Sequence, residues 1–176
     1  MKIAIFGGSF DPMHYGHVDI VRNLLGKYDK VIVTPTNVSY YKKNTAMFTF
    51  NQRIEMCKLM LEKEFGEKII VSDIEKDIRE DEGFSHILLK LKKLFPNDEL
   101  YTVIGSDSYN YIYKWRNYQD IITNSKLVVI TRPGYEISNK LNIPYDKIEL
   151  SNDISSTKIR NKIIELIITS KINRID

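Results

Sequence analysis

Short apolar segments alternate along the chain with longer segments in which apolar residues recur every three or four positions. The short segments are rich in β-branched residues and predict strands, whereas the recurring pattern predicts amphipathic helices. The predicted strands are Lys2–Phe6, Lys30–Thr34, Lys68–Ser72, Leu100–Ile104 and Lys126–Thr131. The predicted helices are Gly16–Leu25, Thr49–Glu64, Ser85–Phe95 and Ser156–Thr169, with one more helix expected between the last two strands.

Strands that alternate with helices at this spacing predict an α/β fold, built from right-handed βαβ units around an open parallel sheet. In such folds ligands bind outside the carboxyl ends of the strands. The rule selects four loops as the place for chemistry: Gly7–His17, Thr34–Lys43, Gly105–Asp107 and Thr131–Tyr135. A chain of 176 residues without a repeat is expected to form one domain, residues 1–176, with 155–176 as a C-terminal helical segment.

The composition is that of an ordinary soluble globular protein, with 43% hydrophobic and 28% charged residues. A net charge of +3 is too small to predict binding to nucleic acid. No apolar run approaches 18 residues, so no membrane span is expected, and the start of the chain lacks the features of a signal peptide. Cys57 is the single cysteine, which excludes an internal disulfide framework and a Cys-rich zinc site. We therefore expect a cytoplasmic protein.

The strongest motif, GGSFDPMHYGH, joins the first predicted strand to the first predicted helix at residues 7–17. Gly7 and Gly8 allow main-chain N–H groups to approach a ligand, and the helix start adds free donors and partial positive charge. His14 and His17 lie three residues apart, so both can face one side of the first turn. The motif predicts an anion pocket with two imidazoles, although a glycine pair alone often marks only a tight turn. It is neither a P-loop nor a dinucleotide fingerprint, and His86, the remaining histidine, does not complete a metal site.

A second motif, ISSTKIR at residues 154–160, opens the last predicted helix. Serine and threonine at this position are typical of a plain helix N-cap. A Ser/Thr-rich helix start followed by Lys158 and Arg160 is also suited to phosphate. Two anion-binding helix starts in one α/β domain favour a long polyphosphate as the ligand.

Together the two motifs resemble the HxGH and ISSTxxR motifs of the nucleotidyltransferase superfamily. Within it the chain is most similar to bacterial nicotinate-nucleotide adenylyltransferases, over roughly residues 1 to 165. Three further segments carry this similarity: VSDIE at 71–75, IGSDS at 104–108 followed by Lys114 and Trp115, and TRPGY at 131–135. The resemblance implies a Rossmann-like open parallel sheet with helices on both faces.

Other segments depart from that branch. The stretches 18–21 and 37–43 lean towards the phosphopantetheine branch, which nevertheless has threonine where this chain has His14. Ser85-His86-Ile87 replaces the Ser-Tyr-Thr of the acceptor loop, and the chain ends in SKINRID without the usual Leu-Val-Pro segment. A pantetheine-phosphate adenylyltransferase and a non-catalytic nucleotide-binding paralogue therefore stay open as alternatives.

The resemblance implies transfer of AMP from ATP to nicotinate mononucleotide, which gives nicotinate adenine dinucleotide and pyrophosphate, a step of NAD biosynthesis. Since the acceptor phosphate is already anionic, the enzyme would need no general base and would act by in-line positioning and charge stabilisation. Mg²⁺ would accompany ATP and bridge triphosphate oxygens with few protein ligands. The sequence leaves the oligomeric state open, a homo-oligomer included.

The resemblance also assigns roles to individual residues. The implied catalytic residues are His14, His17 and Arg160. The implied ATP-binding residues are Gly7, Gly8, Ser9, Phe10, His14, His17, Gly105, Asp107, Arg132, Ser156, Thr157 and Arg160, and the implied acceptor-binding residues are Lys42, Lys43, Ser85, Asp107 and Trp115. Five of these have plainer alternatives: Trp115 as packing, Asp107 as a helix N-cap, Lys42 and Lys43 as part of a solvated loop, and Arg132 as a salt-bridge partner.

Overall fold

A computed structural model describes the chain except for residues 38–45, 80, 133, 139, 151–155 and 173–176. Six parallel strands form one sheet in the order β3-β2-β1-β4-β5-β6. They are β1 (Lys2–Gly8), β2 (Lys30–Pro35), β3 (Ile69–Val71), β4 (Glu99–Gly105), β5 (Lys126–Thr131) and β6 (Tyr145–Glu149). The α-helices are α1 (Tyr15–Leu25), α2 (Phe50–Phe65), α3 (Phe84–Leu94), α4 (Ser106–Asn110), α5 (Tyr118–Asn124) and α6 (Ser156–Ile172), with 3₁₀ turns at Gly66–Lys68 and Ile112–Lys114.

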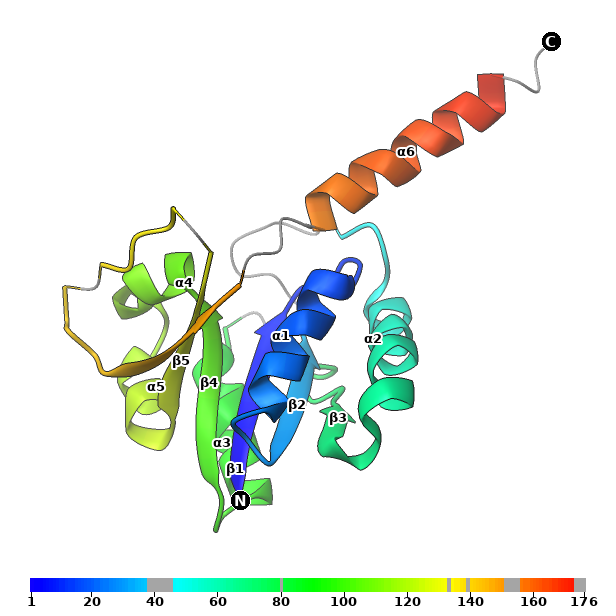
Figure 1. Ribbon diagram of the computed structural model, residues 1–176. Helices are drawn as coiled ribbons and strands as arrows, with labels where there is room; N and C mark the ends of the chain where they lie inside the picture. Colours follow the sequence, from blue (N-terminus) through cyan, green and yellow to red (C-terminus); the bar gives the residue numbers. More distant parts are fainter. Residues whose placement is uncertain (38–45, 80, 133, 139, 151–155, 173–176) are drawn as a thin grey trace.

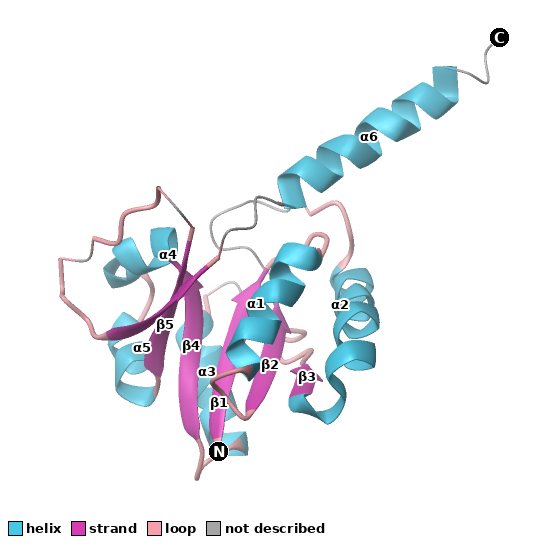
Figure 2. Cartoon of the chain, viewed as in Figure 1, coloured by secondary structure: helices cyan, strands magenta, loops and turns pink. Residues whose placement is uncertain are grey.

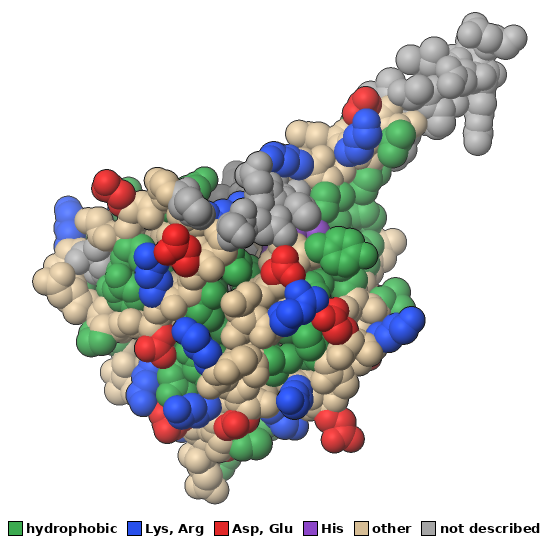
Figure 3. Space-filling model, viewed as in Figure 1, with side chains coloured by type: hydrophobic (Ala, Val, Ile, Leu, Met, Phe, Trp, Pro, Cys, Tyr) green, Lys and Arg blue, Asp and Glu red, His purple; other side chains and the backbone are tan. Residues whose placement is uncertain are grey.

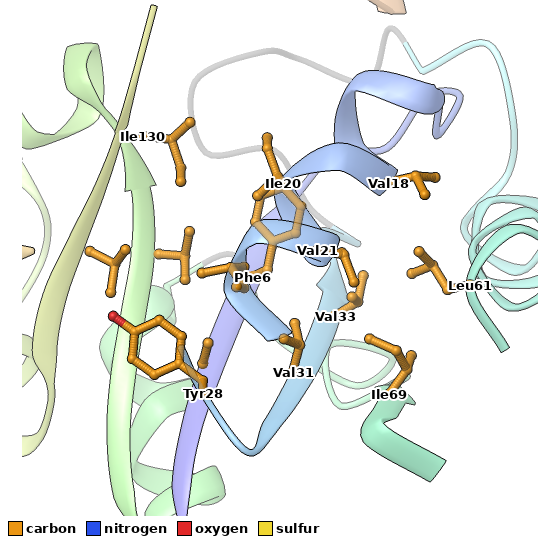
Figure 4. Packing of buried hydrophobic residues seen from close by; sticks show 14 of the residues in the cluster. Phe6, Val18, Ile20, Val21, Tyr28, Val31, Val33, Leu61, Ile69 and Ile130 are labelled. Atoms are coloured by element: carbon orange, nitrogen blue, oxygen red, sulfur yellow. The ribbon is translucent and has the colours of Figure 1, made fainter. Parts of the chain in front are cut away.

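The central strands are apolar throughout because both faces of the sheet are covered (Figures 1 and 2). Ala4 and Phe6 of β1 point to one face, where they pack with residues of α1 and α2; Figure 4 shows this layer. Ile3 and Ile5 point to the other face and pack with residues of α3 and α5. Alternation along one strand thus supplies two separate cores.

The predicted α/β fold with an open parallel sheet and helices on both faces is confirmed, as are all five predicted strands. Strand β1 is longer than predicted because Gly7 and Gly8 pair with Thr34 and Pro35 of β2. In place of the single helix expected between β4 and β5, the chain forms three short helical segments: α4, the 3₁₀ turn Ile112–Lys114 and α5. α6 begins at Ser156 as predicted, continues to Ile172 and projects away from the sheet (Figure 1).

Strand β6 was missed by the sequence pattern. Its residues read Tyr-Asp-Lys-Ile-Glu, and Ile148 alone among them is buried. As an edge strand it pairs on one side with β5, so it needs neither a continuous apolar run nor strict alternation. Its charged residues also make the edge unattractive for pairing with another sheet.

The start of α2 confirms the capping box that the sequence predicts. The Thr49 hydroxyl accepts the Gln52 main-chain N–H at 3.2 Å, and the Gln52 side chain accepts the Thr49 N–H at 3.0 Å. We expect Thr49→Ala to lower the free energy of unfolding by about 1 kcal/mol, because one helix-start donor loses its partner. Urea denaturation measures the change. The exposed Thr123→Ala in α5 is the control and should change stability by a few tenths of a kcal/mol at most; equal losses in both variants would contradict the capping role.

Candidate active site

A cleft of about 1260 Å³ opens at the carboxyl edge of the sheet, where the strand order reverses between β1 and β4. All four loops that the sequence selects contribute to it. The lining residues are Phe6, Gly7, Gly8, Ser9, His14, Gly16, His17, Ile20, Thr36, Glu75, Gly83, Phe84, Val103, Ile104, Gly105, Ser106, Asp107, Ser108, Lys114, Trp115, Arg116, Ile130, Arg132 and Tyr135. The carboxyl ends of β1 and β4 bring Gly7, Gly8 and Gly105 into the lining, and Phe84 and Trp115 add aromatic rings to it.

The glycine pair is held against neighbouring side chains. A Cβ atom at Gly8 would lie 3.2 Å from the Phe10 ring, and one at Gly7 would lie 3.3 Å from the Thr34 hydroxyl. The Phe10 ring is buried and packs edge-on against Phe6 and His17, and Phe10 is not among the described residues that line the cleft. Its φ of 45° is uncommon for a bulky residue, so the surrounding contacts must hold it there.

His14 and His17 lie together at the start of α1, with their rings stacked at 3.8 Å between centroids. The His14 main-chain N–H donates to His17 Nδ1 at 3.2 Å. A ring nitrogen that accepts a hydrogen bond carries no proton, so the neutral His17 ring holds its proton on Nε2. Within the described part of the chain, His14 Nδ1 is buried without a hydrogen-bond partner.

Both imidazoles are neutral near pH 7 in the free protein. Burial lowers the pKa of His17 to about 3, with smaller contributions from His14 and Arg132. Burial and the nearby Arg132 also lower the pKa of His14. Neutral rings act as hydrogen-bond donors and acceptors rather than as cations, while the positive charge nearby comes from Arg132 at the end of β5.

The start of α6 lies on the histidine loop rather than among the described residues that line the cleft. The Ser156 hydroxyl donates to the Pro12 carbonyl at 2.9 Å. The Arg160 guanidinium donates to the Asp11 carbonyl at 2.5 Å and to the Thr157 hydroxyl at 3.1 Å, and it lies 3.7 Å from the Asp11 carboxylate. The two sequence motifs are thus in contact, because Ser156 and Arg160 donate hydrogen bonds to main-chain carbonyls of the histidine loop.

The predicted acceptor residues are distributed unevenly. Trp115 and Asp107 line the cleft, and Trp115 is half-buried with its ring edge-on to Phe84 at 6.1 Å. Asp107 lies in the first turn of α4, whose N-cap is Gly105, so the N-cap alternative for Asp107 does not hold. Ser85 is buried next to Phe84 and is not among the described lining residues. Lys42 and Lys43 lie outside the described residues.

A family profile of cytidylyltransferase-like proteins matches residues 5–162 of the chain. Two curated proteins with the name "Probable nicotinate-nucleotide adenylyltransferase" are similar to it along most of its length. The one from Fusobacterium nucleatum is 36% identical over 93% of this chain and 88% of its own. The one from Clostridium tetani is 34% identical over 92% of this chain and 86% of its own. The chain belongs to the cytidylyltransferase-like family, on its nicotinate-nucleotide adenylyltransferase branch.

The fold of this family member also resembles a solved structure at lower identity. Plasmodium falciparum nicotinic acid mononucleotide adenylyltransferase complexed with NaAD superposes with a TM-score of 0.73 at 23% identity, over 91% of this chain and 82% of that one. The same protein complexed with APC gives a TM-score of 0.71. In the part of our chain that the structure describes, no helix has the length and apolarity to cross a membrane.

Three buried charged residues beside the cleft were missed as site residues by the sequence reasoning: Asp11, Arg53 and Glu75. The Asp11 carboxylate accepts the main-chain N–H groups of Met47 and Phe48 at 2.8 and 2.9 Å. Glu75 lines the cleft and accepts the Asn37 N–H at 3.0 Å. Asp11 stands inside the GGSFDP motif and Glu75 ends the VSDIE segment, so both had a sequence signal. Arg53 becomes visible only when distant loops meet.

Glu75 makes the stability of this family member pH-dependent. Burial raises the pKa of Glu75 to about 7, against the opposing effects of the Asn37 N–H and Arg53. A carboxyl whose pKa is raised on folding favours the folded state below its unfolded pKa, and this contribution is lost as pH rises through 7. Glutamine at this position cannot ionise. We therefore expect the free energy of unfolding of Glu75→Gln, compared with that of wild type, to rise by on the order of 2 kcal/mol between pH 5 and pH 8.

The measurement is the free energy of unfolding from urea denaturation at both pH values. Glu67→Gln, at an exposed glutamate in the turn after α2, controls for loss of one negative charge. A Glu75→Gln gain that is equal at pH 5 and pH 8 would contradict the raised pKa.

Proposed function

We propose that this protein transfers AMP from ATP to nicotinate mononucleotide, giving nicotinate adenine dinucleotide and pyrophosphate. One observation carries the proposal: a single cleft is lined both by a histidine pair on a glycine-rich loop and by the aromatic pair Phe84 and Trp115. Its volume of about 1260 Å³ exceeds the range of pockets for one drug-sized ligand, roughly 300–1,000 Å³, and suits two nucleotides side by side. The branch to which the chain belongs supports the same reaction.

The phosphate end suits charge stabilisation without a base. An oxygen of the acceptor phosphate attacks the α-phosphorus of ATP, the bond to the bridging α–β oxygen breaks, and pyrophosphate leaves with that electron pair. His17 donates from Nε2, the nitrogen its own Nδ1 contact leaves protonated, to an oxygen of the transferring phosphate. Arg132 adds positive charge at the same place. These preorganised donors stabilise the transition state more than the ground state.

Pyrophosphate release is assigned to the start of α6. Ser156 and Arg160 already donate hydrogen bonds to the histidine loop, and Arg160 also donates to the Thr157 hydroxyl. We propose that they bind the β- and γ-phosphates when ATP fills the cleft, Arg160 as a two-pronged donor. The Gly8–Phe10 main chain holds neighbouring phosphate oxygens.

Mg²⁺ is proposed to enter with ATP as part of the substrate. Among the described residues no three His, Cys, Asp or Glu side chains gather as a ready-made site, while Asp107 provides one carboxylate in the cleft. This donor set fits an ion held chiefly by phosphate oxygens and water, as Mg²⁺ commonly is. When bound, the ion neutralises charge on the triphosphate.

The acceptor is proposed to lie against the aromatic pair Phe84 and Trp115. One ring face of Trp115 can stack on the pyridine ring, since Phe84 approaches it edge-on and leaves it half-buried. Asp107 can accept hydrogen bonds from a ribose diol. Lys42 and Lys43 are proposed for the acceptor phosphate on the strength of the sequence alone.

A pyrophosphate-release assay tests the reaction. With ATP and Mg²⁺, we expect turnover with nicotinate mononucleotide and much less with nicotinamide mononucleotide or phosphopantetheine. His17→Ala should lower kcat by about 10²–10³-fold, the range for loss of one preorganised donor. Thr123→Ala, at an exposed residue of α5 outside the cleft lining, is the control and should keep normal turnover. Preferred use of phosphopantetheine would overturn the acceptor, and no turnover with any acceptor would overturn the function.

A second experiment tests the acceptor site through Trp115. Stacking on a base is worth about 1–3 kcal/mol, so Trp115→Ala should raise the Kd for nicotinate mononucleotide roughly five- to hundred-fold. The Kd for ATP should stay nearly constant, and Trp115→Phe should recover part of the loss. Tyr111→Ala removes an exposed aromatic ring nearby and serves as the control. Equal losses for both ligands, with a lower melting temperature, would assign Trp115 to packing.

A further inference from the structure

Arg53 of α2 is a buried cation that the reaction described above leaves without a role. The residue is 3% exposed. Its guanidinium donates only to main-chain carbonyls in the described structure: from Nε to Phe48 at 3.1 Å, and from Nη1 to Ser9 at 2.6 Å and Thr36 at 2.8 Å. Burial of a guanidinium is unfavourable unless its donors are satisfied, and the three carbonyl oxygens accept from two of its nitrogens.

Two of these carbonyls belong to the loops that carry the phosphate-facing end of the cleft. Ser9 follows β1 and Thr36 follows β2, two strands that pair as neighbours up to Gly8 and Pro35. Both residues line the cleft. Arg53 therefore ties two cleft loops to α2.

The contact with Ser9 has a directional consequence. A trans peptide unit is planar, with its C=O and N–H pointing in opposite directions. Because the Ser9 carbonyl points to Arg53, the Phe10 N–H of the same peptide points away from α2. Phe10 also has the unusual φ of 45°, a conformation that a bulky residue keeps only when its neighbours hold it.

We propose that Arg53 is a positioning residue for ATP, which fixes the Ser9–Phe10 peptide so that the Phe10 N–H faces the cleft as a donor to a triphosphate oxygen. The inference rests on the proposed function in that it requires ATP to bind at this end of the cleft. Arg53 itself touches no substrate. It acts by setting the peptide before the ligand arrives, so that no binding energy is spent on reorienting the loop.

Binding of α,β-methylene-ATP, measured by calorimetry, tests the role. We expect Arg53→Gln to weaken this binding about ten- to hundred-fold, the range for hydrogen bonds to a charged group. Arg53→Lys keeps the charge but not the fork, and should lose less than Arg53→Gln. The affinity for nicotinate mononucleotide should stay within about two-fold in both variants, since none of the hydrogen bonds of Arg53 is to Phe84 or Trp115.

Leu61→Val, two turns along α2 and fully buried in the core, is the stability control. It should lower the melting temperature and leave the affinity for the analogue unchanged. If Arg53→Gln is folded and binds the analogue as tightly as wild type, the positioning role is wrong while the proposed function stands. If wild-type protein does not bind the analogue at all, the proposed function itself is wrong.

A measurement on the wild-type protein needs no variant. In an ¹H–¹⁵N spectrum, the Phe10 amide proton should shift strongly downfield on addition of α,β-methylene-ATP, as expected for a donor to phosphate. The Asp29 amide, which already donates to the Lys2 carbonyl at the far end of the sheet, should not move and serves as the internal control. An unchanged Phe10 amide in a sample with bound analogue would overturn the inference even if the Arg53 variants fail to fold.

Discussion

The active site depends on the reversal of strand order beside β1. The chain winds outward from β1 to β3 on one side, then returns to place β4 on the other. The loops after β1 and β4 therefore diverge to opposite faces and leave a crevice between them, which neither helix layer covers. Because the strands on both sides are buried and apolar, the crevice has rigid walls, and its chemistry is confined to loops at one edge.

Main-chain groups do much of the work in this crevice, and buried charges decide how they point. Arg53 collects carbonyls from two loops, while the Asp11 carboxylate collects N–H groups at the start of α2. Each charge satisfies main-chain groups that would otherwise be buried without partners. On the face shown in Figure 3, the basic and acidic side chains are intermingled over the surface.

Much of this could be predicted from the sequence, for identifiable reasons. The apolar, β-branched runs of the four inner strands are buried on both faces, and the short edge strand β3 has the same composition, so the pattern indicates all five strands. The GGSFDPMHYGH string indicates the loop that carries His14 and His17. β6 escaped prediction because an edge strand has one buried residue, Ile148. Arg53 escaped because its partners lie 44 and 17 residues away, and a lone arginine in a polar helix turn has the pattern of an exposed residue. The placement of Arg160 on the Asp11 carbonyl likewise joins residues 149 positions apart.

The aromatic contacts of His17 have a consequence for how the site responds to its solution. The ring is held by Phe6, Phe10 and the His14 ring, and by one main-chain hydrogen bond. None of these contacts is between ions, so dissolved salt does not screen them. The attraction that we propose between anionic nucleotides and Arg132 or Arg160 would be screened. Ionic strength should therefore govern how much of the protein is occupied while leaving the orientation of the imidazole, and the rate of the bound complex, nearly untouched.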